Sequence, residues 1–145
     1  MLDGLFVTPA VTAISEALAS AHAEGAIAVV GNAKLATALG DTREVIPVGL
    51  PARAAKKLPA AVPDFSTIPP RSLAAVIAID VTEDNGWADT LRTFTRAVRD
   101  GGVLVFVDRG HAEQASRRAL CAGLSELEQR HAGRTVVTSG LVSHL

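Results

Sequence analysis

The chain has 145 residues, of which 48% are hydrophobic, 20% charged and 3% aromatic, and its formal net charge is −1. This composition supports one domain with a real core and supplies no field that would attract nucleic acid or an anionic membrane. The single cysteine excludes an intrachain disulfide. No secretory leader or membrane-length apolar run is recognisable, so we expect a cytoplasmic protein.

Helical and strand patterns alternate from the start of the chain. Residues 1–25 form a predicted helical segment, with the helix itself over residues 11–23 and Thr8 or Thr12 as its cap. Apolar runs over residues 26–30, 73–79 and 103–107 are typical of strands buried on both faces. A shorter strand over residues 44–48 contains Pro47, which cannot donate to a ladder, so this strand should lie near a sheet edge.

The remaining segments complete an α/β pattern. Further helices are predicted over residues 32–39, 52–58, 87–98 and 111–121, and the proline-rich segment 59–70 is expected to be mostly loop, anchored by Phe65. Residues 124–131 and 135–142 alternate apolar and polar side chains around a turn, which predicts an antiparallel hairpin. We therefore predict a single domain over residues 1–145, with a mostly parallel sheet and right-handed crossovers.

The second half resembles the class I S-adenosylmethionine (SAM)-dependent methyltransferases. Residues 72–81 (SLAAVIAIDV) are similar to that family's fourth strand, residues 92–102 to the helix and Gly-Gly turn that follow, and residues 103–108 to the fifth strand. Residues 122–124 and the two alternating strands after them resemble the final hairpin. The resemblance implies a Rossmann-like sheet with helices on both faces and strand order 3-2-1-4-5-7-6, with the last strand antiparallel. It also implies SAM as cofactor if the site is functional.

The first half departs from the family where the cofactor would bind. The family's first loop is rich in glycine, which lets the backbone approach a cofactor closely. Here Gly31 is kept, but Ala33 and Leu35 stand where further glycines are expected, and Val29 stands near the expected acid. The family's second strand ends in a carboxylate for the ribose hydroxyls, whereas residues 48–51 read Val-Gly-Leu-Pro. Losing that hydrogen bond removes about 1.5–3 kcal/mol of binding energy.

Five residues are candidates for cofactor contacts: Gly31, Asn32, Gly49, Asp64 and Asp80. Gly31 and Asn32 could touch a nucleotide, or the turn could simply require glycine. Asp64 lies in the loop where the family contacts adenine, and a solvated or helix-capping aspartate is the alternative. Asp80 ends a central strand, where open α/β sheets bind ligands, and it could equally act as a cap.

Other reactive side chains give weaker signals. The acids that follow Asp80, together with Asp108, could form an acidic rim, which is more often a solvated edge than a metal site. The histidines fit no zinc motif, and His111 is expected at the surface at the start of a helix. Cys121 is expected to be a buried, small hydrophobe. We identify no metal ligands and no catalytic residue.

Two classes of function remain open. The first is a methyltransferase-like pseudoenzyme with an eroded cofactor site that acts through protein contacts, as a homodimer or with another protein. The alternative is an active SAM-dependent methyltransferase with an atypical cofactor loop, for which Asp80 and His111 are the only candidates for a general base. A third option is a different small ligand in the same cleft.

Overall fold

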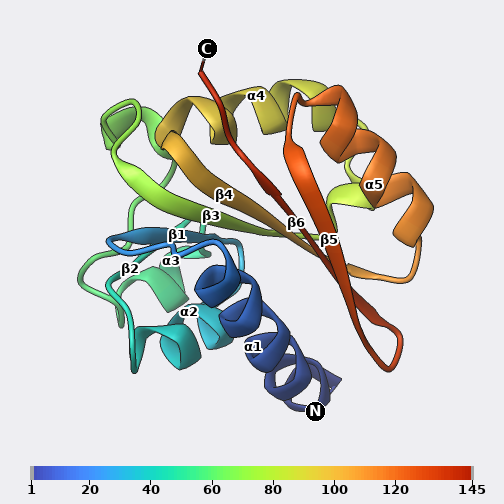
Figure 1. Cartoon of the computed structure of the whole chain (residues 1–145). Coiled ribbons are helices and arrows are strands. Elements are labelled where there is room, and N and C mark those ends of the chain that lie inside the picture. The colour runs from blue at the N-terminus through green and yellow to red at the C-terminus, as the bar shows by residue number, and fades with distance from the viewer. Residues whose placement is uncertain (1, 145) are drawn as a thin grey trace.

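The apolar runs of the chain pair into one six-stranded sheet in the computed structural model, which describes the backbone of residues 2–144 and the side chains of residues 10–144. Its spatial order is β2-β1-β3-β4-β6-β5 (Figure 1). Strands β1 to β4 are mutually parallel, and β6 is antiparallel to both of its neighbours. The bounds are β1 (Ile27–Val30), β2 (Val45–Val48), β3 (Leu73–Ile79), β4 (Val98–Arg109), β5 (Ser125–Ala132) and β6 (Thr135–Leu141).

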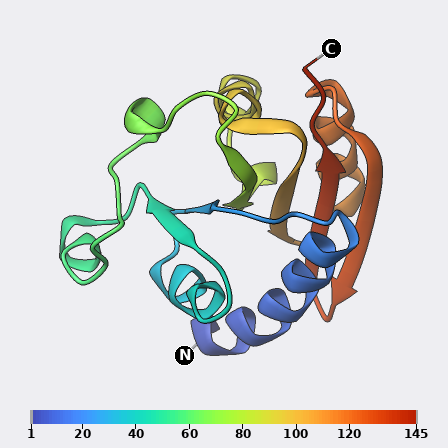
Figure 2. The same cartoon turned by 60° about the vertical axis from the view of Figure 1, so that its left-hand side comes forward.

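Helices cover both faces of this sheet (Figure 2). Helices α1 (Leu2–Ser20) and α2 (Ala33–Gly40) pack on one face, and α4 (Trp87–Ala97) and α5 (Ala112–Cys121) pack on the other. The short helix α3 (Ala52–Ala55) follows β2, and two single 3₁₀ turns, η1 (Phe65–Thr67) and η2 (Val81–Glu83), flank β3. Among the described residues, no helix combines the length and the apolar character needed to cross a membrane.

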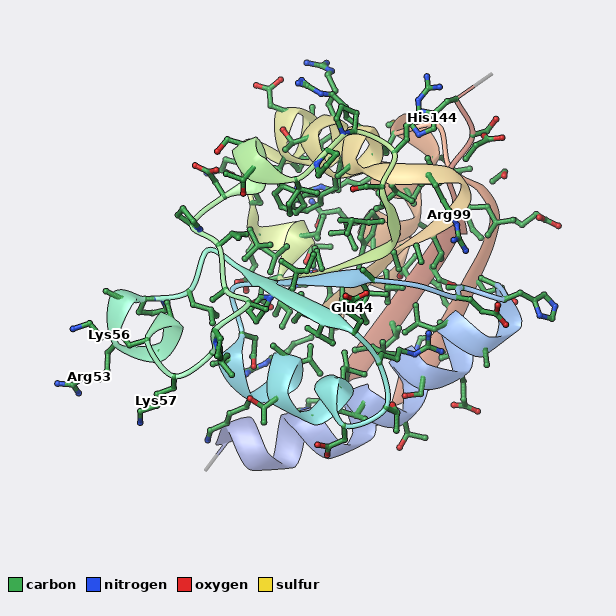
Figure 3. The ribbon with its side chains drawn as sticks, turned by 90° about the vertical axis from the view of Figure 1, so that its left-hand side faces the viewer. Glu44, Arg53, Lys56, Lys57, Arg99 and His144 are labelled. Atoms are coloured by element: carbon green, nitrogen blue, oxygen red, sulfur yellow. The ribbon has the colours of Figure 1, made fainter. Side chains whose placement is uncertain are left out.

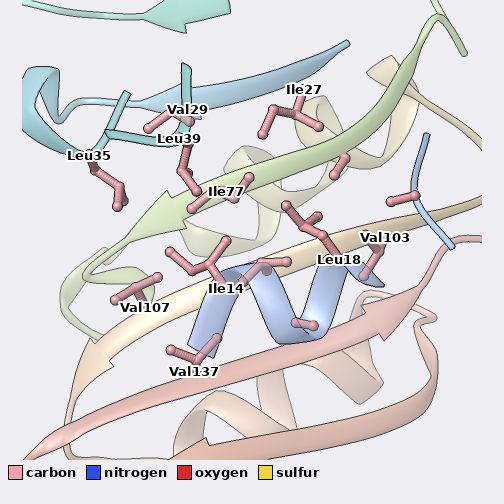
Figure 4. Packing of buried hydrophobic residues seen from close by; sticks show 14 of the residues in the cluster. Ile14, Leu18, Ile27, Val29, Leu35, Leu39, Ile77, Val103, Val107 and Val137 are labelled. Atoms are coloured by element: carbon pink, nitrogen blue, oxygen red, sulfur yellow. The ribbon is translucent and has the colours of Figure 1, made fainter. Parts of the chain in front are cut away.

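The alternation of side chains along the strands divides the core into two clusters. Ile77 of β3 belongs to the cluster beneath α1 and α2, where Ile14 and Leu18 cover the sheet (Figure 4). Its neighbour Val76 belongs to the opposite cluster, which contains Phe94 of α4. Because β3 is buried on both faces, a continuous apolar run is the pattern that it requires.

The predicted fold class is confirmed, and several elements match closely. Strand β3 has the predicted bounds, and the C-terminal hairpin is present. The strand that contains Pro47 is the edge strand β2, as its missing N–H group requires. Phe65 anchors its loop as expected, since its ring centroid lies 5.2 Å from that of Phe94.

The start of the first helix was predicted wrongly. Helix α1 begins at Leu2, so Thr8 and Thr12 lie within it and neither caps its start. Helix α3 is also shorter than the predicted segment 52–58, and none of its residues is buried. A helix without a buried face gains little from packing, which explains why it stops after one turn.

The strand that the resemblance implies beyond β2 is reduced, in the described part of the chain, to one bridge between Val48 and Val62. The Val62 amide donates to the Pro47 carbonyl at 2.9 Å, and the Gly49 amide donates to the Val62 carbonyl at 3.0 Å. Pro63 follows immediately and has no N–H group to continue a ladder. The sheet therefore has the order of the methyltransferase fold without its outermost strand.

The predicted Gly-Gly turn lies within β4, where the pairing with β3 shifts register between Leu73 and Ala75. A Cβ atom at Gly102 would lie 2.4 Å from Cγ1 of Val98 and 2.7 Å from the carbonyl oxygen of Ala74. Only glycine fits at such distances, so this residue makes the irregularity of β4 possible.

Candidate functional site

The carboxyl ends of the four parallel strands meet at one edge of the sheet, and four predicted polar or glycine positions lie at these ends or directly after them. Gly31 comes after β1, Gly49 after β2 and Asp80 after β3. Asp108 is the second-to-last residue of β4, where it pairs with Val136 of β6. This is the edge at which open α/β sheets bind ligands. The topology therefore places these residues at one candidate site.

Gly31 and Asn32 form the turn from β1 into α2. Gly31 has φ +75°, a left-handed conformation that favours glycine, and nothing lies within 4 Å of where its Cβ would be. Its amide donates to the Val48 carbonyl at 2.8 Å. The Asn32 side chain accepts a 2.8 Å hydrogen bond from the Leu35 amide and so caps α2. Space remains beside this turn, but the Gly31 amide and the Asn32 side-chain oxygen are engaged within the chain.

The segment after β2 offers a turn without a carboxylate. Gly49 has φ +71°, and its amide is held by Val62. Leu50 is half-buried, and Pro51 precedes α3. No side chain of residues 48–51 can therefore accept hydrogen bonds from a ribose.

Asp64 also bonds locally. Its Oδ1 accepts hydrogen bonds from the Ser66 amide at 2.9 Å and from the Ser66 hydroxyl at 2.5 Å, which caps η1 and lowers the pKa of the Asp64 carboxyl. The helix-capping alternative is thus the arrangement found. Asp64 borders a hollow of about 380 Å³ between its loop and Arg96 of α4. Neither Gly31 nor Asp80 lines that hollow.

Asp80 is the most distinctive of the predicted site residues. It is exposed, has φ +57°, and makes no side-chain cap to η2. A left-handed residue other than glycine is uncommon and gathers at functional sites. Loss of hydration raises the pKa of its carboxyl, and the charge of Glu83 adds to this, while Arg109 acts in the opposite direction. Its amide donates to the Val107 carbonyl at 2.9 Å.

Asp108 corrects the expectation of an acidic rim of solvated loops, because it is fully buried within β4. Its Oδ1 accepts hydrogen bonds from the Thr82 amide at 3.0 Å and the Thr82 hydroxyl at 2.9 Å. Burial raises the pKa of this carboxyl, and the Thr82 hydrogen bonds and the nearby Arg118 act in the opposite direction. Asp108 thus ties η2, and with it the Asp80 turn, to the sheet.

Arg118, which the sequence reasoning missed, holds the same turn from the other side. It is buried in α5, and its guanidinium donates to the carbonyls of Val81 and Asp84 and lies 5.3 Å from the ring centroid of Trp87. The signal for it was weak: Arg118 falls between Ala115 and Ala119 on the buried face of its helix. The site loop is therefore fixed by two buried charged residues.

Two further expectations have different outcomes. His111 is exposed and precedes α5, as predicted, with φ +57°. Cys121 is exposed, so the prediction of a buried cysteine is wrong. The buried residues of α5 are Ala115, Arg118 and Ala119, and Cys121 is the last residue of this helix.

Comparison with known proteins identifies this architecture. No family model matches the sequence, and no curated protein sequence matches it significantly. Solved structures do match. A methyltransferase from Haloferax volcanii, solved in complex with the Trm112 methyltransferase activator, is 17% identical with a TM-score of 0.67 over 91% of this chain and 89% of that one. A SAM-dependent methyltransferase from Thermotoga maritima is 13% identical with a TM-score of 0.67 over 87% and 88%.

PigF, solved with SAH, is 16% identical with a TM-score of 0.67 over 81% of this chain, which spans 50% of PigF. These identities are low, and the likeness lies in the arrangement of strands and helices. The parallel strands, their order and the antiparallel β6 all agree with it. The chain has the class I SAM-dependent methyltransferase fold.

Proposed function

We propose that this chain is a methyltransferase-like protein whose cofactor site is eroded and which acts through contacts with protein rather than by catalysis. One observation carries the proposal. The amides of Gly31 and Gly49 at the carboxyl ends of β1 and β2, and one side-chain oxygen each of Asn32 and Asp64, already make hydrogen bonds within the chain.

The residues present do not fit SAM. Leu50 follows Gly49 where a carboxylate would hold the ribose hydroxyls, and Leu35 stands where the loop would need glycine. Using Asn32 for the ligand would first break the cap of α2, which costs about 1 kcal/mol. A missing charged hydrogen bond removes about 1.5–3 kcal/mol more. Together these losses weaken binding by roughly two to three orders of magnitude.

A role in protein contacts is consistent with the fold. The similar Haloferax volcanii methyltransferase was solved in complex with an activator protein. This precedent supports a different protein as the partner of the present chain. The proposal also includes a second copy of the chain as the partner, which would form a homodimer. Losing the cofactor site removes no part of the two core clusters, so the fold can persist as a scaffold.

The alternative is an active SAM-dependent methyltransferase with an atypical loop, and two observations favour it. The space beside Gly31 is open, and its backbone has the left-handed conformation that close approach to a cofactor uses. Asp80 offers an exposed carboxyl with a raised pKa at the end of a central strand. A carboxyl tuned upward in this way suits a general base.

Calorimetric titration of the whole chain with SAM and with SAH tests the proposal. We expect no heat that saturates below about 0.1 mM ligand, because a hundredfold to thousandfold loss from micromolar affinity leaves a dissociation constant of about 0.1–1 mM. A urea unfolding transition on the same preparation shows that the protein is folded. Micromolar binding of either ligand would overturn the proposal and favour the enzyme. In that case Gly31→Val, which places a β-branched side chain at a left-handed position, should abolish the heat.

A further inference from the structure

A groove lies between α2 and α3, beside the candidate site but lined by other residues. It has a volume of about 620 Å³. Its walls are apolar where α2 faces α3, and charged side chains stand along its rim. The lining residues are Ala33, Lys34, Thr37, Ala38, Pro51, Arg53, Ala54, Lys57 and Leu58.

The groove is open because α3 stands away from the core. Helix α3 buries none of its residues, and Ala54 and Leu58 are only half-buried on the groove wall. Helix α2, in contrast, buries Leu35 and Leu39 against the sheet and presents its opposite face to the groove. Two helices are thus held apart with apolar surface between them.

Among the side chains that the structure describes, the charged residues that line the groove are all cations. Lys34 borders it on α2, and Arg53 and Lys57 border it on the α3 side. No aspartate or glutamate occurs between Glu24 and Asp41, or between Glu44 and Asp64. Figure 3 shows Arg53 of α3, and Lys56 and Lys57 directly after this helix, projecting away from the sheet. The protein as a whole has a net charge of −1, so this cationic rim is a local feature.

Charge and shape together define the occupant. An apolar floor between two helices suits the apolar face of a third helix, and a rim of cations suits acidic side chains beside that face. Helix α2 has eight residues and is about 12 Å long, which matches roughly two turns of a bound helix. We propose that this groove binds an acidic amphipathic helix of a protein partner, an inference that rests on the proposed function in protein contacts.

Other occupants fit less well. None of the described residues that line the groove is aromatic, so none of them could stack on a base. Helix α3 has four residues and no apolar face long enough to lie in a bilayer surface. A protein helix uses both the apolar floor and the charged rim.

The test uses the full chain and a synthetic, fluorescently labelled helical peptide of about four turns, with leucine on one face and glutamate on the other. Two control peptides are used. The first has the same composition in scrambled order, and the second has lysine in place of glutamate. Fluorescence anisotropy measures affinity, and amide chemical shifts in ¹⁵N-labelled protein report where the peptide binds. We expect saturable binding of the acidic amphipathic peptide alone, with shifts confined to residues 33–38 and 51–58.

Adjacent lysines provide a matched pair of variants. Lys57 lines the groove, whereas Lys56 is exposed on the same segment and does not line it. Lys57→Glu should weaken peptide binding about tenfold, because attraction becomes repulsion at the rim, and Lys56→Glu should weaken it less than about threefold. Both substitutions change the net charge equally, and both sites are exposed, so the unfolding midpoints should stay unchanged.

Several results would overturn the inference. These are no saturable binding, shifts outside the two segments, equal effects of the two lysine variants, or binding to phosphatidylserine vesicles without binding to the peptide. Failure of the proposed function is read separately, from SAM calorimetry on the same preparation. If the chain binds neither SAM nor the peptide, the proposal of an eroded cofactor site stands and the proposal for the groove fails. If the chain binds SAM, the proposed function fails, whether or not the peptide binds.

Discussion

Replacing Asp108 by alanine should destabilise the protein far more than replacing it by asparagine. The buried Oδ1 of Asp108 accepts two hydrogen bonds from Thr82, one from its amide and one from its hydroxyl. Alanine leaves the amide without an acceptor, which costs about 1–3 kcal/mol, and removes the hydroxyl bond, worth about 1 kcal/mol. Removing a buried carboxylate oxygen that has no partner among the described residues offsets part of this. We expect a net loss of about 2 kcal/mol.

Asparagine keeps an oxygen at the same position, so Asp108→Asn should cost less than about 1 kcal/mol. The two variants also differ in their dependence on pH. Burial raises the pKa of Asp108 in the folded protein above its ordinary value of 3.8, so the folded state binds this proton more tightly than the unfolded state. Its contribution to stability is therefore complete below pH 3.8 and is lost as the pH rises through the folded pKa. The asparagine variant has no such loss.

Urea unfolding of the wild type and both variants, from pH 4 to pH 8, measures these effects. Asp80, His111 and Arg118 lie near Asp108 and are present in all three proteins, so the difference between wild type and Asp108→Asn reports the carboxyl together with its electrostatic coupling to these groups. As the pH rises, the free energy of unfolding of Asp108→Asn should increase relative to that of the wild type. A cost below about 0.5 kcal/mol for alanine, or a difference independent of pH, would refute the role assigned to Asp108.

Three further substitutions, one of them with a matched control, test the local structure. Asn32→Ala removes the cap of α2 and should lower the free energy of unfolding by about 1 kcal/mol in urea titrations; no change would mean that the cap contributes nothing. Gly102→Ala should lower the free energy of unfolding by about 3 kcal/mol or leave the chain unfolded. Its control is Gly40→Ala, at a position where nothing lies within 4 Å of the added Cβ, and this change should be neutral or stabilising by about 0.5 kcal/mol. Ser66→Ala should return the lowered pKa of Asp64 toward its ordinary value in an NMR titration, and an unaltered pKa would contradict the hydrogen bonds described.

The sheet was predictable because the sequence of apolar and polar residues in most of its strands fits a strand better than a helix. Residues 73–79 are apolar throughout, and a strand buried on both faces is the structure that uses every one of them. Pro47 placed its strand at an edge for a reason that is purely local, the missing N–H group. The first helix was harder, because Pro9 beside Thr8 is typical of a helix start, yet α1 continues through both.

The site depends on contacts between distant residues and was predictable only in outline. The strand ends brought Gly31, Gly49 and Asp80 to one edge of the sheet, as their positions in the sequence predict, and the capping alternative for Asp64 is the arrangement found. The partners of Asp108 and Arg118 were not predictable, since Thr82 lies 26 residues from Asp108 and Val81 lies 37 residues from Arg118. Whether a strand-end acid is solvated or buried is decided by the helix packed over it, here α5.

The central claim is that the edge formed by Gly31, Gly49 and Asp80 does not bind the cofactor of its fold. The most direct measurement is a titration of ¹⁵N-labelled protein with SAH, following the backbone amide signals of these three residues. The claim predicts that no shift at any of them saturates below about 0.1 mM SAH. Saturable shifts at Gly31 and Gly49 with a micromolar midpoint would contradict it and would establish a working cofactor site.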